Sequence, residues 1–455
     1  MSKTIKLKKG FTINLAGKAE NKIVEKDQPE TFAIKPAEFN HITMAKMLVK
    51  EGDNVKAGTP LFFEKTMEEV KFCAPVSGEI VEIKRGEKRK VVEIKILADK
   101  EVEFESNKSY SSSEVSNLNK EELKEILTNG GVWPNVIQRP YGCVANPGDT
   151  PKSIFISAFD SSPQAPNYSF VYEGQEQYFQ AGINVLKKFT SGGIHLNTDL
   201  NAEVPTIFSQ CENVQHNKIS GVHPAGNVGV QIHHIDPINK GDLVWTVSPQ
   251  GVIEIGKLLI EGKYDTSKLV AVGGSQVSNP SYVKTYTGAC LNKVLDGNLK
   301  EGDSRFISGN VLTGIAVGLD GYLSFYHSQI TVIPEGKYEE LFGWITPSSK
   351  KLSFHKAFGL LSYLGGSKKE YVLDTNQHGE HRNFVMTGAF EKVLPMDILP
   401  NYLFKAILAE DFDDMEALGI YEVVEEDVAL CEFIDVSKHD LQDILREGIQ
   451  LIKNG

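Results

Sequence analysis

Cysteine is scarce in this chain, with five residues in 455, and they are far apart along the sequence. Their positions give neither the spacing of a disulfide framework nor the two-to-four-residue spacing of an iron–sulfur ligand set. Cys431 is the single cysteine of the C-terminal region, where Asp435 follows four residues on. We therefore expect a reducing compartment such as the cytoplasm and no cluster at this end of the chain.

The chain also lacks long apolar runs and an excess of basic over acidic residues. The run "NVLTGIAVGL" is too short and too rich in glycine to cross a bilayer. The start of the chain, "MSKTIKLKKG", has lysines but no apolar core of a secretory signal. The net charge of -12 argues against nucleic acid or an anionic membrane as an electrostatic partner. We expect no direct bilayer span.

The short motifs of familiar catalytic sites do not occur. The chain has no GxGxxG, no GxxxxGK[ST], no HExxH and no GxSxG. In "NQHGEHRNF", His378 and His381 are separated by a glycine, which favours a solvated loop over a zinc-binding helix. We therefore predict no catalytic residue, no metal site and no bound cofactor in this chain.

Residues 51–83 have the short, turn-bounded strands of a small β-barrel, and they resemble the biotinyl/lipoyl domain. In that family the modified lysine follows a glutamate at the hairpin tip by three residues. Glu64 matches the glutamate, but Met67 stands in the position of the lysine, and Lys65 is out of register. A thioether cannot form the amide link, so we expect an unmodified barrel-sandwich domain.

The pattern divides an α/β multidomain chain into five parts. Residues 1–34 form a lead-in segment and residues 35–104 the barrel-sandwich domain, before a Ser/Asn-rich linker. Residues 105–256 alternate buried strands such as "SIFISAF" with helices such as "EGQEQYFQAGINVLKKF", which predicts a mostly parallel sheet. Residues 257–336 are β-rich, and residues 337–455 are helical and more acidic.

The stretch "NGGVWPNVIQRPYG" allows two interpretations. Its glycines after a predicted helix suit a backbone cradle for phosphate. Trp133, however, adds bulk where such a loop needs bare backbone, so we favour a helix C-cap followed by a buried Trp.

The most unusual run is "SGVHPAGNVGVQIHHIDP", residues 220–237. It supplies the candidate site residues, which are His223, Gly226, His233, His234 and Asp236. Adjacent histidines on a regular element point apart, which disfavours a single metal ion. The alternatives are histidines that donate hydrogen bonds to a carbonyl or quinone oxygen, or a tight loop whose histidines satisfy buried backbone groups.

Several long strings together resemble one family, the A subunit of the sodium-translocating NADH:quinone oxidoreductase. They include "RPYGCVANPGDTPKSIFISAFDSSPQAP", "HPAGNVGVQIHHIDP", "ITVIPEGKYEELFGW", "EKVLPMDILPNYLFKAI" and "EEDVALCEF". The family is also similar to the C subunit of the Rnf complex and to the NADH- and FMN-binding subunit of complex I. The resemblance implies a barrel-sandwich domain, a Rossmann-like domain, a ubiquitin-like β-grasp domain and a C-terminal helical domain related to cluster-binding domains.

The resemblance further implies a peripheral cytoplasmic subunit on the inner membrane, without a flavin of its own. It would act with membrane subunits in a complex that oxidises NADH, reduces quinone and exports sodium, and it would contribute to quinone interaction. The flavin-binding relatives have "GGAGFPT" where this chain has "GGVWPN". Asp435 stands where many family members keep a second cysteine. Two alternatives stay open: a stand-alone flavin/NADH diaphorase, or a carrier protein modified at Lys65.

Overall fold

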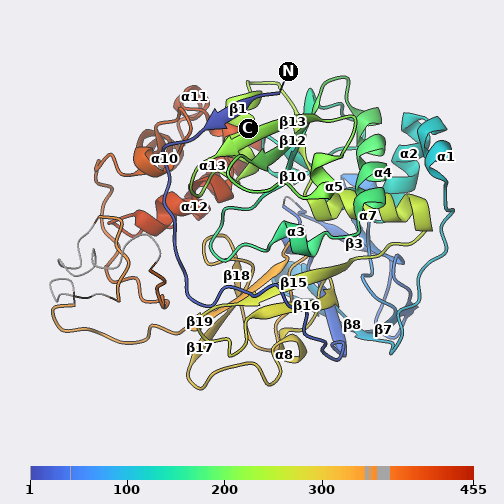
Figure 1. Cartoon of the computed structure of the whole chain (residues 1–455), viewed down its shortest axis with the longest axis horizontal. Coiled ribbons are helices and arrows are strands. Elements are labelled where there is room, and N and C mark those ends of the chain that lie inside the picture. The colour runs from blue at the N-terminus through green and yellow to red at the C-terminus, as the bar shows by residue number, and fades with distance from the viewer. Residues whose placement is uncertain (1, 41, 344–347, 349, 356–368, 455) are drawn as a thin grey trace.

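A computed structural model describes residues 2–40, 42–343, 348, 350–355 and 369–454 of the chain. The described part contains four β-sheets and a C-terminal group of helices (Figure 1). Together they confirm the multidomain α/β class that the sequence predicts.

Two small sheets near the N-terminus share one hydrophobic core and form a β-sandwich. Alternate apolar residues of each strand point into it, and Phe62 stacks on Phe72 at 4.7 Å between ring centroids. One sheet has the order β2-β8-β7-β4 and the other β3-β5-β6. The strands are β2 (Thr31–Ile34), β3 (Ala45–Met47), β4 (Asn54–Val55), β5 (Pro60–Glu64), β6 (Met67–Cys73), β7 (Gly78–Arg85) and β8 (Val91–Ala98).

A seven-stranded sheet of order β1-β13-β12-β11-β14-β9-β10 forms the centre of the molecule. Its first five strands in this order are parallel, and the last two are antiparallel additions. The strands are β1 (Thr4–Lys6), β9 (Ile137–Arg139), β10 (Cys143–Val144), β11 (Ser153–Ser157), β12 (Ile194–Asp199), β13 (Gln215–Ser220) and β14 (Val244–Thr246).

The direction of the chain reverses beside β11. From β11 the chain passes to β12 and β13 on one side, and then returns to β14 on the other side. Loops at such a switch point, at the carboxyl ends of parallel strands, leave a crevice where α/β proteins bind ligands. This edge of the sheet therefore positions the candidate site.

Helices cover both faces of this sheet. Because side chains alternate along β11, Ile154 and Ile156 join the core beneath α4 (Glu176–Leu186) and α7 (Pro249–Glu261), whereas Phe155 packs with α6 (Val228–Ile235). Ser248 caps α7 and Gly262, at φ 69°, ends it. The other helices of this region are α1 (Ser112–Asn117), α2 (Lys120–Asn129), α3 (Tyr168–Val171) and α5 (Thr206–Ser209).

A five-stranded sheet follows, in the order β16-β15-β19-β17-β18. Only the β15–β19 pair in it is parallel. Its elements are β15 (Ser267–Gly273), β16 (Ser281–Tyr286), α8 (Leu291–Val294), β17 (Ser304–Ser308), β18 (Ile315–Val317) and β19 (Gln329–Pro334).

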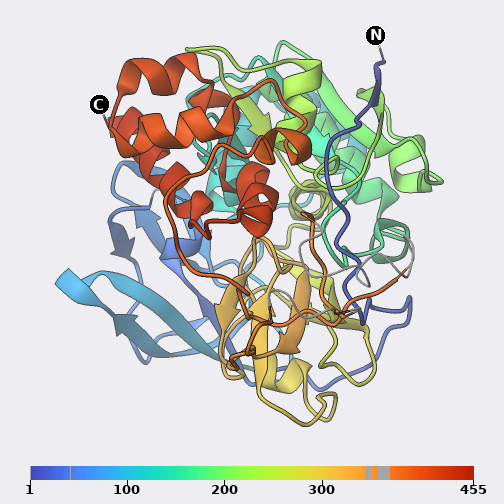
Figure 2. The same ribbon diagram turned by 90° about the vertical axis from the view of Figure 1, so that its left-hand side faces the viewer.

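The C-terminal helices have a hydrophobic core of their own. In the last helix Leu441, Leu445 and Ile449 recur every four residues and are all buried, which fixes the face that it packs against its neighbours. The helices lie beside the seven-stranded sheet (Figures 1 and 2). They are α9 (Phe390–Val393), α10 (Pro400–Leu408), α11 (Phe412–Ala417), α12 (Glu425–Ile434) and α13 (Leu441–Asn454).

The N-terminal segment runs across several of these parts (Figures 1 and 2). It pairs with β13 through β1, and Val24 N donates to Tyr282 O beside the five-stranded sheet. Residues 31–34, which the sequence placed in the lead-in, pair with β8 in the β-sandwich. The polar lead-in is thus built into the fold by backbone pairing, which leaves little trace in side-chain composition.

Two further details differ from the sequence-based expectation. The predicted boundary at residues 256/257 falls inside α7, whose thirteen residues form one capped helix. The run from residue 220 to 237 is not a loop throughout, because its second half forms α6. Buried Ile232 and Ile235 hold that helix on the sheet, and buried Val230 packs in the C-terminal core, despite the glycine and histidines of the same helix.

The contact between α4 and α7 tests this packing. A Cβ added to Gly256 would lie 1.9 Å from Tyr178 O, a backbone atom that cannot rotate away. We expect Gly256→Ala to lower the free energy of unfolding by about 3 kcal/mol or more, at the upper end of overpacking costs. Gly318→Ala is the matched control, because its nearest neighbour is 4.0 Å away. Equal urea midpoints for the two variants would contradict this account.

Candidate functional site

The five candidate residues lie at two separate places. His223 and Gly226 belong to the loop after β13, at the carboxyl edge of the sheet. His233, His234 and Asp236 lie at the far end of α6, whose eight residues span about 12 Å. Asp236 accepts a hydrogen bond from Ser153, the first residue of β11, at 2.7 Å. The structure therefore does not bring the five side chains together.

A chain of buried polar side chains fixes the start of α6 over the end of β11. Asn197 donates to Gln231 Oε1 at 2.8 Å, and Gln231 Nε2 donates to Ser157 Oγ at 2.7 Å. Ser157 Oγ in turn donates to Gly226 O at 2.9 Å. Buried amides need such partners, so this chain sets the position of the loop that carries His223.

His223 has one used and one unused ring nitrogen. Its Nδ1 lies 3.1 Å from Ser161 Oγ, which also accepts a hydrogen bond from Gly226 N at 2.8 Å. When the Ser161 hydroxyl donates to Nδ1, the remaining proton of the neutral ring lies on Nε2. The side chain is buried, and Nε2 has no partner among the described residues. Burial lowers the pKa of His223 to about 4, so the ring is uncharged at neutral pH, and Nε2 is a donor in the tautomer in which Ser161 donates to Nδ1.

His233 and His234 point toward different partners on the C-terminal helices. His233 Nδ1 lies 2.7 Å from Glu422 Oε2, and its Nε2 accepts from Asp397 N at 3.0 Å. His234 Nε2 donates to Pro395 O at 2.7 Å. Both rings line a shallow depression of about 350 Å³. Its other walls are Lys6, Leu7, Lys8, Lys9, Pro395, Met396 and Asp397.

The carboxylate of Asp236 is held by two neighbouring side chains. Lys152 Nζ lies 3.0 Å from its Oδ1, and Ser153 Oγ donates to its Oδ2. These contacts tie the end of α6 to the amino edge of β11. Asp236 is thereby committed to holding the helix in place.

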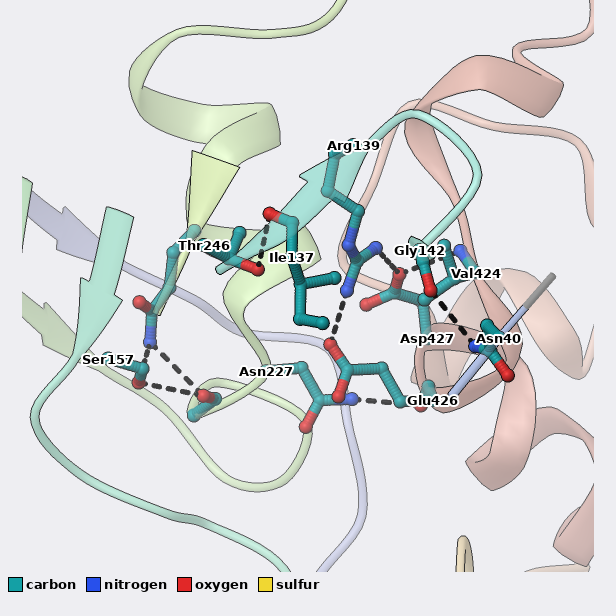
Figure 3. A network of polar contacts seen from close by, with 12 residues as sticks. Asn40, Ile137, Arg139, Gly142, Ser157, Asn227, Thr246, Val424, Glu426 and Asp427 are labelled. Carbon is teal, nitrogen blue, oxygen red and sulfur yellow. Dashed lines mark hydrogen bonds and ion pairs between the residues drawn. The ribbon is translucent and has the colours of Figure 1, made fainter. Parts of the chain in front are cut away.

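A buried ion network joins the sheet to the C-terminal helices (Figure 3). Arg139 donates to Asp427 Oδ2 at 3.0 Å and to Glu426 Oε1 at 2.6 Å. Burial raises the pKa of Asp427, and the charge of Arg139 opposes that shift. Asn227, which precedes α6, donates to Glu426 O at 2.9 Å. The first turn of α12 is therefore bonded to both the sheet and the loop of His223.

The glycine stretch of residues 130–135 does not fit a phosphate or flavin. Trp133 is fully buried there, its Nε1 donates to Ala145 O at 2.8 Å, and its ring meets that of Trp245 edge-on. Tyr326 OH donates to Pro134 O at 2.7 Å and covers the loop from the five-stranded sheet. Side chains thus fill the volume in which a cofactor would need bare backbone.

The other sequence candidates lie apart from this region. Lys65 is in the turn between β5 and β6, where Glu64 pairs with Met67. Cys431 is fully buried, and burial raises the pKa of its thiol, which opposes the thiolate form that metals bind. Within the described ranges, no three His, Cys, Asp or Glu side chains are grouped so as to hold a metal ion.

Sequence reasoning missed Ser161, Arg139 and Asp427. Ser161 lies within "FDSSPQ", where one of two serines gives no sign that it contacts a histidine 62 residues away. Arg139 and Asp427 are 288 residues apart, so nothing local relates them. The available signal was weak: in "EEDVALC" Asp427 is the last of three acidic residues and directly precedes an apolar stretch.

These observations define the class of the protein: it is a multidomain α/β protein whose central sheet has a switch point at β11. None of the helices in the described ranges has the length and apolar character needed to cross a membrane. Three family models match the chain. They are the NqrA N-terminal barrel-sandwich hybrid domain over residues 5–99, the NqrA second alpha/beta domain over 118–264 and the NQRA C-terminal domain over 269–318.

Full-length relatives agree with these models. The A subunit of the Na(+)-translocating NADH-quinone reductase from Yersinia pestis bv. Antiqua (strain Angola) is 38% identical over 453 residues, 99% of each chain. The corresponding protein of Alcanivorax borkumensis, which has the same name, is 36% identical over 451 residues, again 99% of each. The chain belongs to the NqrA family, the A subunits of the Na+-translocating NADH-quinone reductase, as the sequence resemblance predicted.

Among solved structures, an NAD+-reducing NiFe hydrogenase in the H2-reduced state is similar with a TM-score of 0.37 and 12% identity. The match covers 49% of this chain and 48% of that one. A likeness at this level carries no argument about the site.

The ion network gives the first prediction from this site. Arg139→Met would leave the Asp427 carboxylate buried without its cation, and we expect a loss of about 3–5 kcal/mol in the free energy of unfolding. Adding Asp427→Asn should recover most of that loss, because the fully buried carboxylate is then replaced by a neutral amide, while Glu426, the other partner of Arg139, keeps contact with solvent. Urea unfolding of the two single variants and the double variant measures the coupling. Additive losses would show that the two side chains do not interact.

Buried histidines predict acid sensitivity. Burial lowers the pKa values of His195, His223 and His327 to about 4. The unfolded chain binds protons on them below about pH 6.5, so their contribution is complete above that pH and is lost as the pH falls toward 4. We expect His223→Asn to reduce the stability difference between pH 7 and pH 5 by about 2 kcal/mol. Urea unfolding at both pH values checks this, and an unchanged difference would contradict it.

Proposed function

We propose that this chain acts as the A subunit of a sodium-pumping NADH:quinone oxidoreductase. The observation that carries the proposal is identity of 38% across 99% of both chains to a protein of that name. In such a complex NADH is oxidised, quinone is reduced and Na+ is exported. This chain contributes a peripheral, non-spanning part and is not catalytic when isolated.

The chain works without a cofactor of its own, while NADH, quinone and Na+ are used by the complex. Three features support this. Trp133 fills the glycine stretch, Met67 replaces a carrier lysine, and Cys431 is buried without a second thiol nearby in the sequence. Each is a place where a related protein would hold a group and where this chain has placed an ordinary side chain.

The parts of the fold have the identities that the resemblance implies. Residues 35–104 are the barrel-sandwich domain together with β2, residues 105–256 are a Rossmann-like domain together with the remainder of α7, the rest of residues 257–336 is a β-grasp domain, and residues 337–455 belong to a helical domain. Support comes from the parallel strands and switch point of the central sheet. The mixed β15–β19 sheet and the separate C-terminal core support the last two.

Quinone contact lies at the carboxyl edge of the sheet. There His223 donates a hydrogen bond to a quinone carbonyl, and Gly226, which has no side chain, lets the backbone approach the quinone. The uncharged, unused Nε2 of His223 supports this role. His233 and His234 line the outer depression, and Asp236 holds the helix that connects the two places. The partners are membrane subunits of the same complex, on the cytoplasmic face of the inner membrane.

Co-purification tests this proposal. A chain carrying an affinity tag should bring down integral membrane partners from solubilised membranes, together with NADH:quinone reductase activity that Na+ stimulates. A tagged unrelated cytoplasmic protein from the same membranes is the control. A yellow, flavin-bearing chain that reduces quinone alone would favour the diaphorase instead, and an adduct on Lys65 in the intact mass would favour the carrier. Either result, or recovery of the chain alone, would contradict the proposal.

A further inference from the structure

Residues 8–12 form a strap between two anchored positions. Before the strap, Leu7 N donates to Ser220 O at 2.7 Å as an extension of β1. After it, the side chain of Ile13 is only 4% exposed and belongs to the C-terminal core. None of the five strap residues is buried. Phe11 packs partly buried against the C-terminal core, so lifting the strap uncovers this one large apolar side chain but leaves the buried Ile13 in place.

The strap touches both groups of candidate residues. Lys8 and Lys9 line the depression that also contains His233 and His234. The next two residues lie on the loop of His223: Phe11 N donates to His223 O at 2.9 Å, and a Cβ on Gly10 would lie 2.3 Å from that same oxygen. The strap thus contacts both the open depression and the backbone of the residue that carries the buried ring.

Few contacts hold the strap down. Apart from the bond to His223 O, Gly10 N donates to Lys392 O at 3.0 Å, and the Phe11 ring meets Phe354 edge-on at 5.3 Å. Meanwhile Nε2 of His223 has no hydrogen-bond partner among the described residues, and it is a donor when Ser161 donates to Nδ1. An unpaired buried donor is costly, and an acceptor arriving from the depression would remove that cost.

We propose that the strap is a gate, and that lifting residues 8–12 joins the depression to His223 so that a quinone headgroup can present a carbonyl oxygen to Nε2. This inference rests on the proposed quinone contact at His223. A quinone suits the path because it is neutral and planar and carries only acceptors. If the open state is a minor one, the observed affinity is lowered by its population, and any change that favours opening tightens binding by the same factor.

The glycines of the N-terminal segment supply an opener and a matched control. Gly10→Ala places a Cβ against His223 O and must push the strap away, because φ is +136° and the opposing atom is backbone. Gly17→Ala produces a similar clash, 2.3 Å from Gly274 O at φ +91°, but beyond the Ile13 anchor. His223→Asn removes the donor itself. All variants are made in the full-length chain.

Two readouts separate opening from binding. The first is the rate at which diethyl pyrocarbonate modifies His223, followed by peptide mass spectrometry with exposed His381 as internal reference. The second is the Kd for ubiquinone-1 from tryptophan quenching. We expect Gly10→Ala to raise the modification rate of His223 and to lower the Kd for quinone by the same factor, about five or more. For Gly17→Ala we expect both quantities to stay within about twofold of those of the unchanged chain. Saturating quinone should protect His223.

The outcomes distinguish the gate from the site. If His223→Asn weakens quinone binding but Gly10→Ala exposes the ring without changing Kd, the gate is wrong and the quinone contact stands. If His223→Asn leaves Kd unchanged and quinone gives no protection, the contact at His223 is wrong and the gate with it. Should Gly10→Ala fail to fold, Phe11→Ala removes the contact with Phe354 and provides a milder opener with the same expected direction. Equal modification rates in all strap variants would also overturn the gate.

Discussion

The contact between Arg139 and Asp427 is the interaction on which the arrangement of the site depends. It is a charge pair with almost no exposure, and Asp427 also lies so close to Gly229 that a Cβ there would be 2.4 Å from its oxygen. Helix α6 is consequently held between the sheet on one side and α12 on the other. Since the loop of His223 leads directly into α6, the position of the ring follows from a contact made by residues far away in the sequence.

Under the proposed function, the places where the family resemblance would put prosthetic groups are filled by ordinary side chains. Trp133 packs against Trp245, Tyr326 donates to the neighbouring Pro134 O, and Cys431 is part of the C-terminal core. In that proposal the apolar contacts of these side chains pack the domains where a cofactor would otherwise supply its own. Under the proposed function, what remains for chemistry is the carboxyl edge of the sheet and the surfaces of the molecule.

The sequence predicted the elements whose signals are local. Helix α4 is an example, because the stretch "EGQEQYFQAGINVLKKF" that predicted it has an apolar face, and the family resemblance came from long strings that survive divergence. Helix α6 was missed because its glycine and two histidines resemble a loop, while its apolar residues bury only against a sheet formed from distant strands. The pairing of Arg139 with Asp427 and the path of the strap are long-range for the same reason, and no spacing encodes them.

The charges around the strap bear on which ligand could pass beneath it. Outside, Lys8 and Lys9 are exposed and hydrated, whereas His223 beneath is neutral because burial opposes its protonation. An anion held by the lysines would have to give up its hydration to reach a donor that carries no compensating charge, which is unfavourable in a buried place. A neutral carbonyl loses far less on the same path and gains the hydrogen bond that Nε2 lacks. The electrostatic difference between the two ends of the path therefore favours a quinone over a charged ligand.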